Sequence, residues 1–416
     1  MSDYFSYQGN QLCVEQVPLA NIAPRFGTPC YVYSHTALVD GYRQFESAFA
    51  GRSHLVCYAV KANPNLAILH QLAWLGAGFD VVSGGELQRV LAAGAGAGKV
   101  VFSGVGKTVA EMRLALDAEI LCFNVESEAE LMRLDEVAGS MDKIAPVSLR
   151  VNPDVDAKTH PYISTGLRQN KFGVAYTEAL ALYRKATKLP HLRVTGMGCH
   201  IGSQLTETGP FVAAAEKVLA LVDALATEGI TLGHLDFGGG LGIRYNDENP
   251  PSIADYVGAL LGASQSRSEK IIVEPGRVLV GNAGVLLTRV EYLKHGEEKN
   301  FAIVDAAMND LMRPALYDAY HHIQPVQRSS LPVQQYEVVG PICESGDFLG
   351  HARELAIAQG DLLAIMSAGA YGMSMSSNYN SRLRAAEVMV SGTVVQLIRE
   401  RETVHQLFAG EKTFLL

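Results

Sequence analysis

The chain has 416 residues, of which 48% are hydrophobic and 19% charged, a composition typical of a soluble globular enzyme rather than a disordered or fibrous protein. Its formal net charge of -9 argues against a nucleic-acid partner, because neutralising phosphates requires clustered Lys and Arg, and favours small-molecule chemistry. A chain of this length is expected to form two domains, or one large barrel with an appended domain.

The N-terminus and the cysteines lead to further expectations. Residues 1–7 show no basic head followed by an apolar stretch, and no window approaches the roughly 18 apolar residues of a membrane span. We therefore expect a cytoplasmic protein with no membrane partner. The six cysteines have no C-x-x-C spacing, so neither a zinc site nor a disulfide framework is indicated, no metal is expected, and most cysteines should be buried.

A β-rich run, a turn and a helical stretch alternate between about residues 54 and 277. The runs are 54–60, 78–82, 99–103, 119–125, 146–151, 193–199, 234–237 and 270–274. Eight such runs match a (β/α)8 TIM barrel, whose strands are buried on both faces and read as continuous apolar segments. Thr108 and Glu111 form a capping box, and residues 211–228 predict a long helix. We assign residues 36–280 to the barrel.

The sequence changes character after Gly284. Its apolar runs are 285–292, 301–304, 336–339, 361–365 and 387–395, separated by Gly, Pro and Asn. They predict an all-β domain that resembles a β-sandwich or barrel. The first 35 residues are strand-like as well, so residues 1–35 and 281–416 are predicted to form this second domain together.

In a TIM barrel, functional side chains gather where strands end at the C-terminal face. Lys61 directly follows the first run, at the exit of a buried strand, where a desolvated amine can have a lowered pKa and act as a nucleophile. The second run contains Asp80, the fifth ends near Arg150, and His200 and Ser203 follow the sixth. Each of these residues taken alone is also compatible with an ordinary structural role.

Two loops after the seventh and eighth runs predict a phosphate site. The first holds Gly238, Gly239 and Gly240, and the second holds Glu274, Pro275, Gly276 and Arg277. Backbone N–H groups without neighbouring side chains can approach a phosphate closely, and phosphate sites after strands 7 and 8 recur in this fold. A glycine run can equally be a simple turn. In the second domain, the polar clusters 312–317, 343–347 and 369–372 are candidates of the same kind, whereas the pair His321–His322 is expected at the surface.

The ordered motifs YAVKAN (58–63), HIGSQ (200–204), GGG (238–240) and EPGR (274–277) resemble the alanine-racemase-like and ornithine-decarboxylase-like class of pyridoxal 5'-phosphate (PLP) enzymes. That class pairs a (β/α)8 barrel with a β-domain. Four further segments are similar to the diaminopimelate decarboxylase family: 160–166 (HPYISTG), 171–173 (KFG), 312–317 (MRPALY) and 343–347 (CESGD). The resemblance spans about residues 25–390. It implies a carboxy-lyase that converts meso-2,6-diaminopimelate to L-lysine and CO2, the last step of lysine biosynthesis by this pathway.

The resemblance also implies the roles of the cofactor residues. Lys61 would bind PLP covalently, His200 would stack on its ring, and Glu274 would face the pyridine nitrogen. The other cofactor-binding candidates are Asp80, Arg150, Ser203, Gly238, Gly239, Gly240, Gly276, Arg277 and Tyr371. A carboxylate beside the nitrogen favours the protonated ring, which is the stronger electron sink. Alanine racemases have an arginine there, so decarboxylation is expected rather than racemisation.

The resemblance places the substrate's non-reacting end among charged side chains. Its carboxylate would be held by Arg277, Arg313 and Tyr317, with Tyr371 nearby, and its ammonium by Glu344. An arginine fork suits a carboxylate, whereas ornithine decarboxylase places an acid at this end. Cys343 would protonate the reacting carbon. Cys343 and Glu344 would come from the second subunit of a homodimer with shared active sites.

Alternative functions would leave different signs in the sequence. Ornithine, arginine and carboxynorspermidine decarboxylases would keep the cofactor residues and change the distal pocket. Arg313 with Glu344 argues against the first two more strongly than against the third. A non-catalytic PLP-binding homeostasis protein would be a short single barrel, and this chain has a second domain.

Overall fold

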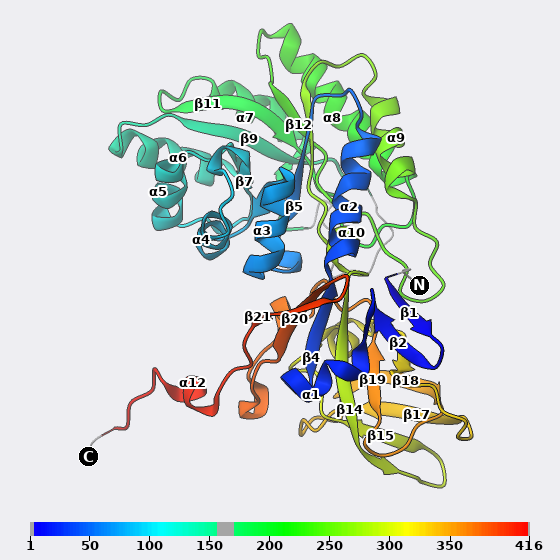
Figure 1. The fold of residues 1–416 in the computed structure, drawn as a ribbon. Coiled ribbons are helices and arrows are strands. Elements are labelled where there is room, and N and C mark those ends of the chain that lie inside the picture. The colour runs from blue at the N-terminus through cyan, green and yellow to red at the C-terminus, as the bar shows by residue number, and fades with distance from the viewer. Residues whose placement is uncertain (1–3, 156–169, 415–416) are drawn as a thin grey trace. The chain divides into compact units, whose positions relative to one another are not determined.

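The computed structural model describes residues 4–155 and 170–414. The chain forms two compact units (Figure 1). The barrel unit comprises Val39–Arg244 and Glu248–Val278, and the β unit comprises Met1–Leu38, Tyr245–Asp247 and Leu279–Leu416. The segment 160–166 lies outside the described residues. No helix among the described residues is long and apolar enough to cross a membrane.

The barrel unit is built on eight parallel strands that close on themselves. They are β5 (His54–Ala59), β6 (Gly78–Val81), β7 (Val100–Phe102), β8 (Cys122–Val125), β9 (Ala145–Asn152), β11 (Leu192–Gly198), β12 (His234–Asp236) and β13 (Lys270–Val273). Each strand pairs with the next, and β13 pairs back to β5. The short strand β10 (Val174–Ala175) adds to β9. The predicted TIM barrel is confirmed, and its eight runs contain the eight strands to within a residue or two.

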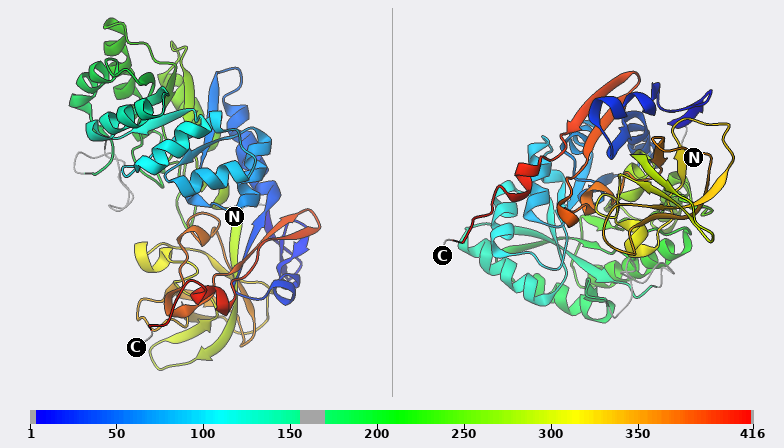
Figure 2. Two further views of the ribbon diagram at one scale, coloured as in Figure 1. Left: turned by 90° about the vertical axis from the view of Figure 1, so that its left-hand side faces the viewer. Right: turned by 90° about the horizontal axis from the view of Figure 1, so that it is seen from below.

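Helices lie on the outside of these strands (Figure 2). They are α2 (His35–Ala48), α3 (Leu66–Leu75), α4 (Gly84–Ala92), α5 (Val109–Ala118), α6 (Glu128–Ser140), α7 (Ala179–Ala186), α8 (Gly209–Thr227) and α9 (Ile253–Ala263). The capping box predicted at Thr108 and Glu111 begins α5, and the helix predicted over 211–228 is α8. Ser83, Thr108, Ser127 and Ser252 cap the starts of α4, α5, α6 and α9 by accepting amides that the first helical turn leaves without partners.

The β unit contains two sheets. The larger has the strand order β18-β17-β15-β14-β4-β20-β21, with β19 joined to β14 and β16 joined to β19. Its strands are β4 (Cys30–Ser34), β14 (Gly284–Lys294), β15 (Asn300–Val304), β16 (Ile323–Pro325), β17 (Gln334–Val339), β18 (Phe348–Leu355), β19 (Leu362–Ile365), β20 (Ala386–Ser391) and β21 (Val394–Arg399). The smaller sheet holds β1 (Phe5–Gln8), β2 (Gln11–Val14) and β3 (Val17–Pro18). The predicted all-β character is confirmed, but the run 387–395 is part of a hairpin that turns at Gly392.

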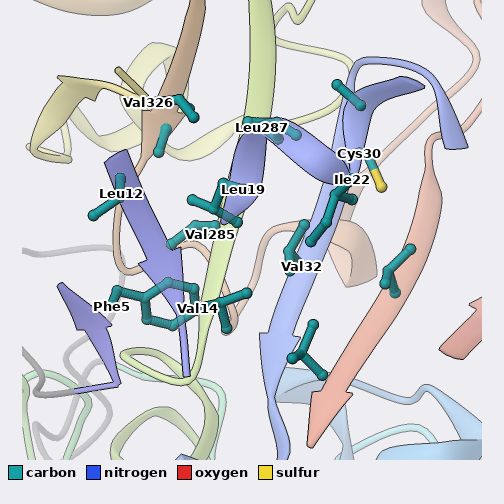
Figure 3. Close-up of a cluster of buried hydrophobic side chains, with 14 of the residues drawn as sticks. Phe5, Leu12, Val14, Leu19, Ile22, Cys30, Val32, Val285, Leu287 and Val326 are labelled. Carbon is teal, nitrogen blue, oxygen red and sulfur yellow. The ribbon is translucent and has the colours of Figure 1, made fainter. Parts of the chain in front are cut away.

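The core of the β unit joins its N-terminal strands to strands from much later in the chain. Strand β4 lies between β14 and β20, antiparallel to the first and parallel to the second. Figure 3 shows side chains of β2, β4 and β14 packed together. Among the fully buried ones are Leu12, Val32 and Val285. Burying such side chains away from water is the main stabilising contribution to this sheet.

The short helices α11 (Arg313–Tyr317) and α12 (Val404–Phe408) belong to the β unit. The short helix α10 (Arg277–Val280) spans the boundary between the two units in the sequence. A fourth, α1 (Ala23–Phe26), precedes β4. All six cysteines are free thiols; five are buried and Cys343 is exposed. Within the described part of the chain, no group of three or more His, Cys, Asp or Glu is placed to hold a metal ion.

Candidate active site

Lys61 follows β5 in a short 3-10 turn, Val60–Ala62. Its Nζ lies 2.6 Å from Oδ2 of Asp80, on the neighbouring strand β6. The lysine side chain is 39% exposed and the aspartate 1%. The amine is therefore ion-paired and partly exposed, not desolvated as the strand-end position suggested. The second carboxylate oxygen of Asp80, Oδ1, is buried and accepts no hydrogen bond from the described residues.

A pair of buried acids lies at the ends of β12 and β13. Asp236 and Glu274 are hydrogen-bonded to each other, and Nδ2 of Asn124 approaches both, at 3.5 and 3.4 Å. Burial, followed by the charges of Asp236 and Asp80, raises the pKa of Glu274 well above its ordinary value. Burial also raises the pKa of Asp236. The pair consequently retains a proton that a basic group placed beside it could accept.

His200 follows β11 and is half-buried. The amide of Gly239 donates to its Nδ1 at 3.2 Å, so a neutral ring carries its proton on Nε2. Burial, with smaller effects from Arg150 and Lys61, lowers the pKa of His200 well below its ordinary value. The imidazole is therefore neutral and suited to stacking against a flat ring.

Arg150, on β9, is held by a residue that the sequence analysis did not identify. Its Nη1 lies 3.2 and 3.3 Å from the two carboxylate oxygens of Glu126, which directly follows β8. Glu126 also accepts the amides of Gly104 at 2.8 Å and Gly173 at 3.0 Å. The Arg150 guanidinium lies 5.0 Å from the centre of the Phe172 ring. The rule that pointed to Asp80, a polar residue at a strand end, would also have found Glu126.

The glycine loop packs against the end of β13 with no space for side chains. A Cβ added to Gly239 would lie 2.9 Å from the carbonyl carbon of Glu274 and closer still to its oxygen. The amide of Gly238 donates to Asp236 Oδ1 at 2.9 Å, and that of Gly239 is bound to His200. These two amides are engaged within the protein, so among the three glycines of this loop Gly240 is the one left to offer an amide to a phosphate.

Beside this loop, Arg277 and Ser203 are joined to each other. The Nη2 atom of Arg277 donates to Oγ of Ser203 at 3.0 Å, and the arginine is only 6% exposed. Gly276 packs against β5 and the Lys61 turn, where an added Cβ would be 3.1 Å from the Cβ atoms of Ala59 and Ala62. A guanidinium and a hydroxyl next to close-packed backbone are the donors that a phosphate group requires.

The other predicted residues belong to the β unit. Cys343 and Glu344 are exposed on the loop between β17 and β18. The amide of Cys343 donates to Asn380 Oδ1 at 3.2 Å, and the hydroxyl of Tyr379 donates to Glu344. The hydrogen bond to Glu344 raises the pKa of Tyr379. This loop is thereby tied to the 3-10 turn Tyr379–Ser381.

Arg313 and Tyr317 lie on α11, and Tyr371 is half-buried with a left-handed backbone, φ 56°. The Arg313 guanidinium lies 4.6 Å from the centre of the Tyr245 ring, and its Nη1 is 3.0 Å from Nε2 of His321. His321 is 0% exposed, so the prediction that it is a surface residue is wrong. Its burial places it in contact with a predicted substrate residue.

Comparison with known proteins identifies the family. Residues 36–281 match the family model "Pyridoxal-dependent decarboxylase, pyridoxal binding domain". A diaminopimelate decarboxylase from Neisseria meningitidis is 60% identical over 400 residues, which cover 96% of this chain and 97% of that protein. One from Pseudomonas aeruginosa is 60% identical over 409 residues, covering 98% and 99%. The chain belongs to the diaminopimelate decarboxylase family.

Solved structures of the diaminopimelate decarboxylase family agree with this assignment. The diaminopimelate decarboxylase from M. jannaschii, in co-complex with L-lysine, matches with a TM-score of 0.95 and 40% identity, covering 99% of this chain and 98% of that one. The Helicobacter pylori protein, complexed with L-lysine, matches with a TM-score of 0.92 and 43% identity, covering 94% and 98%. The family, the fold and the PLP cofactor predicted from the motifs are confirmed.

The barrel residues fit this cofactor. Four kinds of group lie where the strands end at one face of the barrel. They are the ion-paired amine of Lys61, the neutral imidazole of His200, the Glu274–Asp236 pair that retains a proton, and the Arg277–Ser203 pair beside close-packed glycines. PLP offers an aldehyde, a basic ring nitrogen, a flat ring and a phosphate. Each of these groups has a chemically matched partner in the barrel unit.

Proposed function

We propose that the chain decarboxylates meso-2,6-diaminopimelate to L-lysine and CO2 as the last step of lysine biosynthesis. The observation that carries the proposal is 60% identity to diaminopimelate decarboxylases over 96 to 98% of the chain. The L-lysine in the solved structures of two relatives is the product that this reaction would form. An amino acid is accordingly the substrate class.

In this proposal the barrel unit holds the cofactor. Lys61 binds it through its amine, His200 lies against its ring, and Ser203, Gly240, Gly276 and Arg277 contact its phosphate. Asp80 positions the Lys61 amine, and the 2.6 Å ion pair between them supports this role. Arg150 is a further cofactor-binding residue, near the ring. Bound PLP supplies the electron sink that accepts the electron pair left on the carbon when CO2 departs.

Glu274 controls the protonation of the ring nitrogen. Its raised pKa keeps a proton on the Glu274–Asp236 pair until a more basic nitrogen lies beside it. With PLP bound, Glu274 would hold this proton toward the ring nitrogen, and its carboxylate would favour the protonated ring by charge pairing. A site of this kind favours full delocalisation and hence decarboxylation over racemisation.

Most of the proposed substrate contacts come from the β unit. Arg313 and Tyr317, with Arg277 and Tyr371, hold the distal carboxylate, and Glu344 holds the distal ammonium. Cys343 delivers a proton from its Sγ to the carbon that has lost CO2. We assign Cys343 and Glu344 to the active site of the partner subunit in a homodimer. Their exposure on the β unit supports this assignment, because both side chains are accessible to another chain.

A substrate panel tests the proposed function. Purified holoenzyme is incubated with meso-diaminopimelate, ornithine, arginine or lysine, and the released CO2 and amine products are quantified. We expect L-lysine from meso-diaminopimelate and little turnover of the other three, because a substrate without the distal carboxylate leaves Arg313 without its partner. Such a loss corresponds to roughly 30-fold to several-thousand-fold in kcat/KM. Equal turnover of ornithine or lysine would refute the proposed substrate.

A mixing experiment tests the shared site separately. Lys61→Ala and Cys343→Ala are each expected to be inactive alone. In a mixed dimer, one site combines an intact barrel with an intact Cys343 loop, so random mixing should restore about a quarter of wild-type activity. No recovery, with exchange of subunits verified by mass spectrometry, would show that the two residues act within one chain.

A further inference from the structure

His321 is buried between α11 and β16 and both of its ring nitrogens have defined partners. Its Nδ1 lies 2.9 Å from the carbonyl oxygen of Met366, and its Nε2 lies 3.0 Å from Nη1 of Arg313. A carbonyl oxygen can only accept and a guanidinium can only donate. The ring must therefore carry its proton on Nδ1 and present the lone pair of Nε2 to Arg313.

His321 and Arg313 also contact the same aromatic ring, that of Tyr245. The Tyr245 ring meets the His321 ring edge-on, with centroids 5.1 Å apart and planes at 75°. The guanidinium of Arg313 lies 4.6 Å from the centre of the same Tyr245 ring. Arg353 donates to the carbonyl oxygen of His321 at 3.1 Å, which fixes the backbone that carries the imidazole. Arg313 is thus restrained by a hydrogen bond to His321 and by a cation–π contact with the Tyr245 ring.

We propose that His321 is a positioning residue for Arg313, and that the neutral imidazole, together with Tyr245, orients the guanidinium for the distal carboxylate of the substrate. His321 would then help to set specificity without touching the substrate. The inference rests on the proposed function, which assigns Arg313 to that carboxylate. A planar fork recognises a carboxylate through two parallel hydrogen bonds, so its orientation determines how well it discriminates.

Two ligands that differ by one carboxylate provide the readout. L-lysine carries the carboxylate that Arg313 is proposed to hold, and 1,5-diaminopentane lacks it. Their dissociation constants for the PLP-loaded protein are measured by calorimetry, and the ratio of the two constants reports on the contacts to that carboxylate. Wild-type protein should prefer L-lysine, and Arg313→Ala should lower this preference sharply.

Two replacements of His321 separate positioning from packing. Asn can place an amide nitrogen where Nδ1 donates to Met366 but provides no acceptor at the position of Nε2. Gln can place its amide oxygen where Nε2 accepts from Arg313. His321→Asn should lower the ratio on the order of tenfold, the loss expected for one hydrogen bond to a charged group, and His321→Gln should restore most of it. His322→Gln, at the half-buried neighbouring histidine, is the matched control and should leave the ratio unchanged.

The outcomes distinguish this inference from the proposed function. A wild-type ratio near one, or an Arg313→Ala ratio equal to wild type, would overturn the distal pocket itself. A ratio that collapses in Arg313→Ala but is unchanged in His321→Asn would overturn the role of His321 alone. A third outcome is that His321→Asn and His321→Gln weaken the binding of both ligands equally and lower the melting temperature by the same amount. In that case His321 only packs the β unit, and the inference is again overturned.

Discussion

Replacing Gly239 with alanine should disturb the cofactor site through a single added carbon. Gly239 is absent from the glycines with positive φ, so its backbone conformation is open to alanine. The obstacle is space, because the new Cβ would lie 2.9 Å from the carbonyl carbon of Glu274 and closer to its oxygen. Both atoms belong to the backbone, and the Glu274 amide is itself bound to Gly238 O at 2.8 Å. The glycine loop and the end of β13 would have to separate.

The size of this effect follows from the distances. Carbon–carbon contacts below 3.0 Å essentially do not occur. The loop or the Glu274 backbone must therefore move by on the order of 1 Å, and such overpacking costs about 1 to 3 kcal/mol. A displacement of that size at groups that bind a reacting molecule can lower the rate by about 100-fold.

The assay compares two glycine-to-alanine variants. PLP affinity is measured by titration of its visible absorption, stability by thermal unfolding, and activity by CO2 release. Gly258, in α9, has nothing within 4 Å of an added Cβ, so Gly258→Ala should raise stability by about 0.5 to 1 kcal/mol. Gly239→Ala should lose PLP affinity and activity. Wild-type affinity in Gly239→Ala would refute the proposed close packing of the cofactor loop.

Three other predictions concern single side chains. Borohydride reduction of the holoenzyme should fix pyridoxyl to one peptide, that of Lys61, and a label on any other lysine would contradict the assignment. Glu274→Gln cannot release the proton, so PLP should still bind while the single-turnover rate falls by about 100-fold or more; an unchanged rate would exclude the role in ring protonation. Burial lowers the pKa of His234 from 6.5 to about 4 in the folded protein. As the pH falls, the unfolded chain therefore binds a proton at this histidine before the folded chain does. The stability of the folded state that is present above pH 6.5 is consequently lost as the pH falls toward 4. Between pH 7.5 and 5 this loss is about 2 kcal/mol, and denaturation of His234→Asn should show a correspondingly weaker pH dependence; equal slopes would show that His234 does not titrate in this way.

The barrel could be predicted because its strands are buried on both faces and form continuous apolar runs. The strands of the β unit were harder. The hairpin β20–β21 has apolar residues on both sides of its turn, and only Ser391–Gly392 marks the reversal. Strand β18 was not predicted because His351, Arg353 and Glu354 interrupt its apolar residues. Backbone pairing with β17, at the edge of the sheet, holds it in place.

For the candidate site, the sequence pointed to residues by their position but not to their chemical state. Lys61, Asp80 and Glu274 stand at strand ends, and that position alone drew attention to them. Their chemical state was less accessible, since the Lys61 ion pair and the raised pKa of Glu274 depend on neighbouring strands that are distant in sequence. His321 was placed at the surface because its burial is created by partners such as Met366 that no local pattern reveals.

The position of β4 has a consequence for the nascent chain. Residues Cys30–Ser34 leave the ribosome early, yet one of their two neighbours, β20, is synthesised about 350 residues later. At about 5 to 20 residues per second, this apolar strand waits roughly 20 to 70 s for that partner. The intervening barrel is complete long before then. During synthesis the N-terminal strand is therefore an unpaired edge, open to aggregation or to protection by a chaperone, and loss of the chain's final 31 residues would leave that edge exposed permanently.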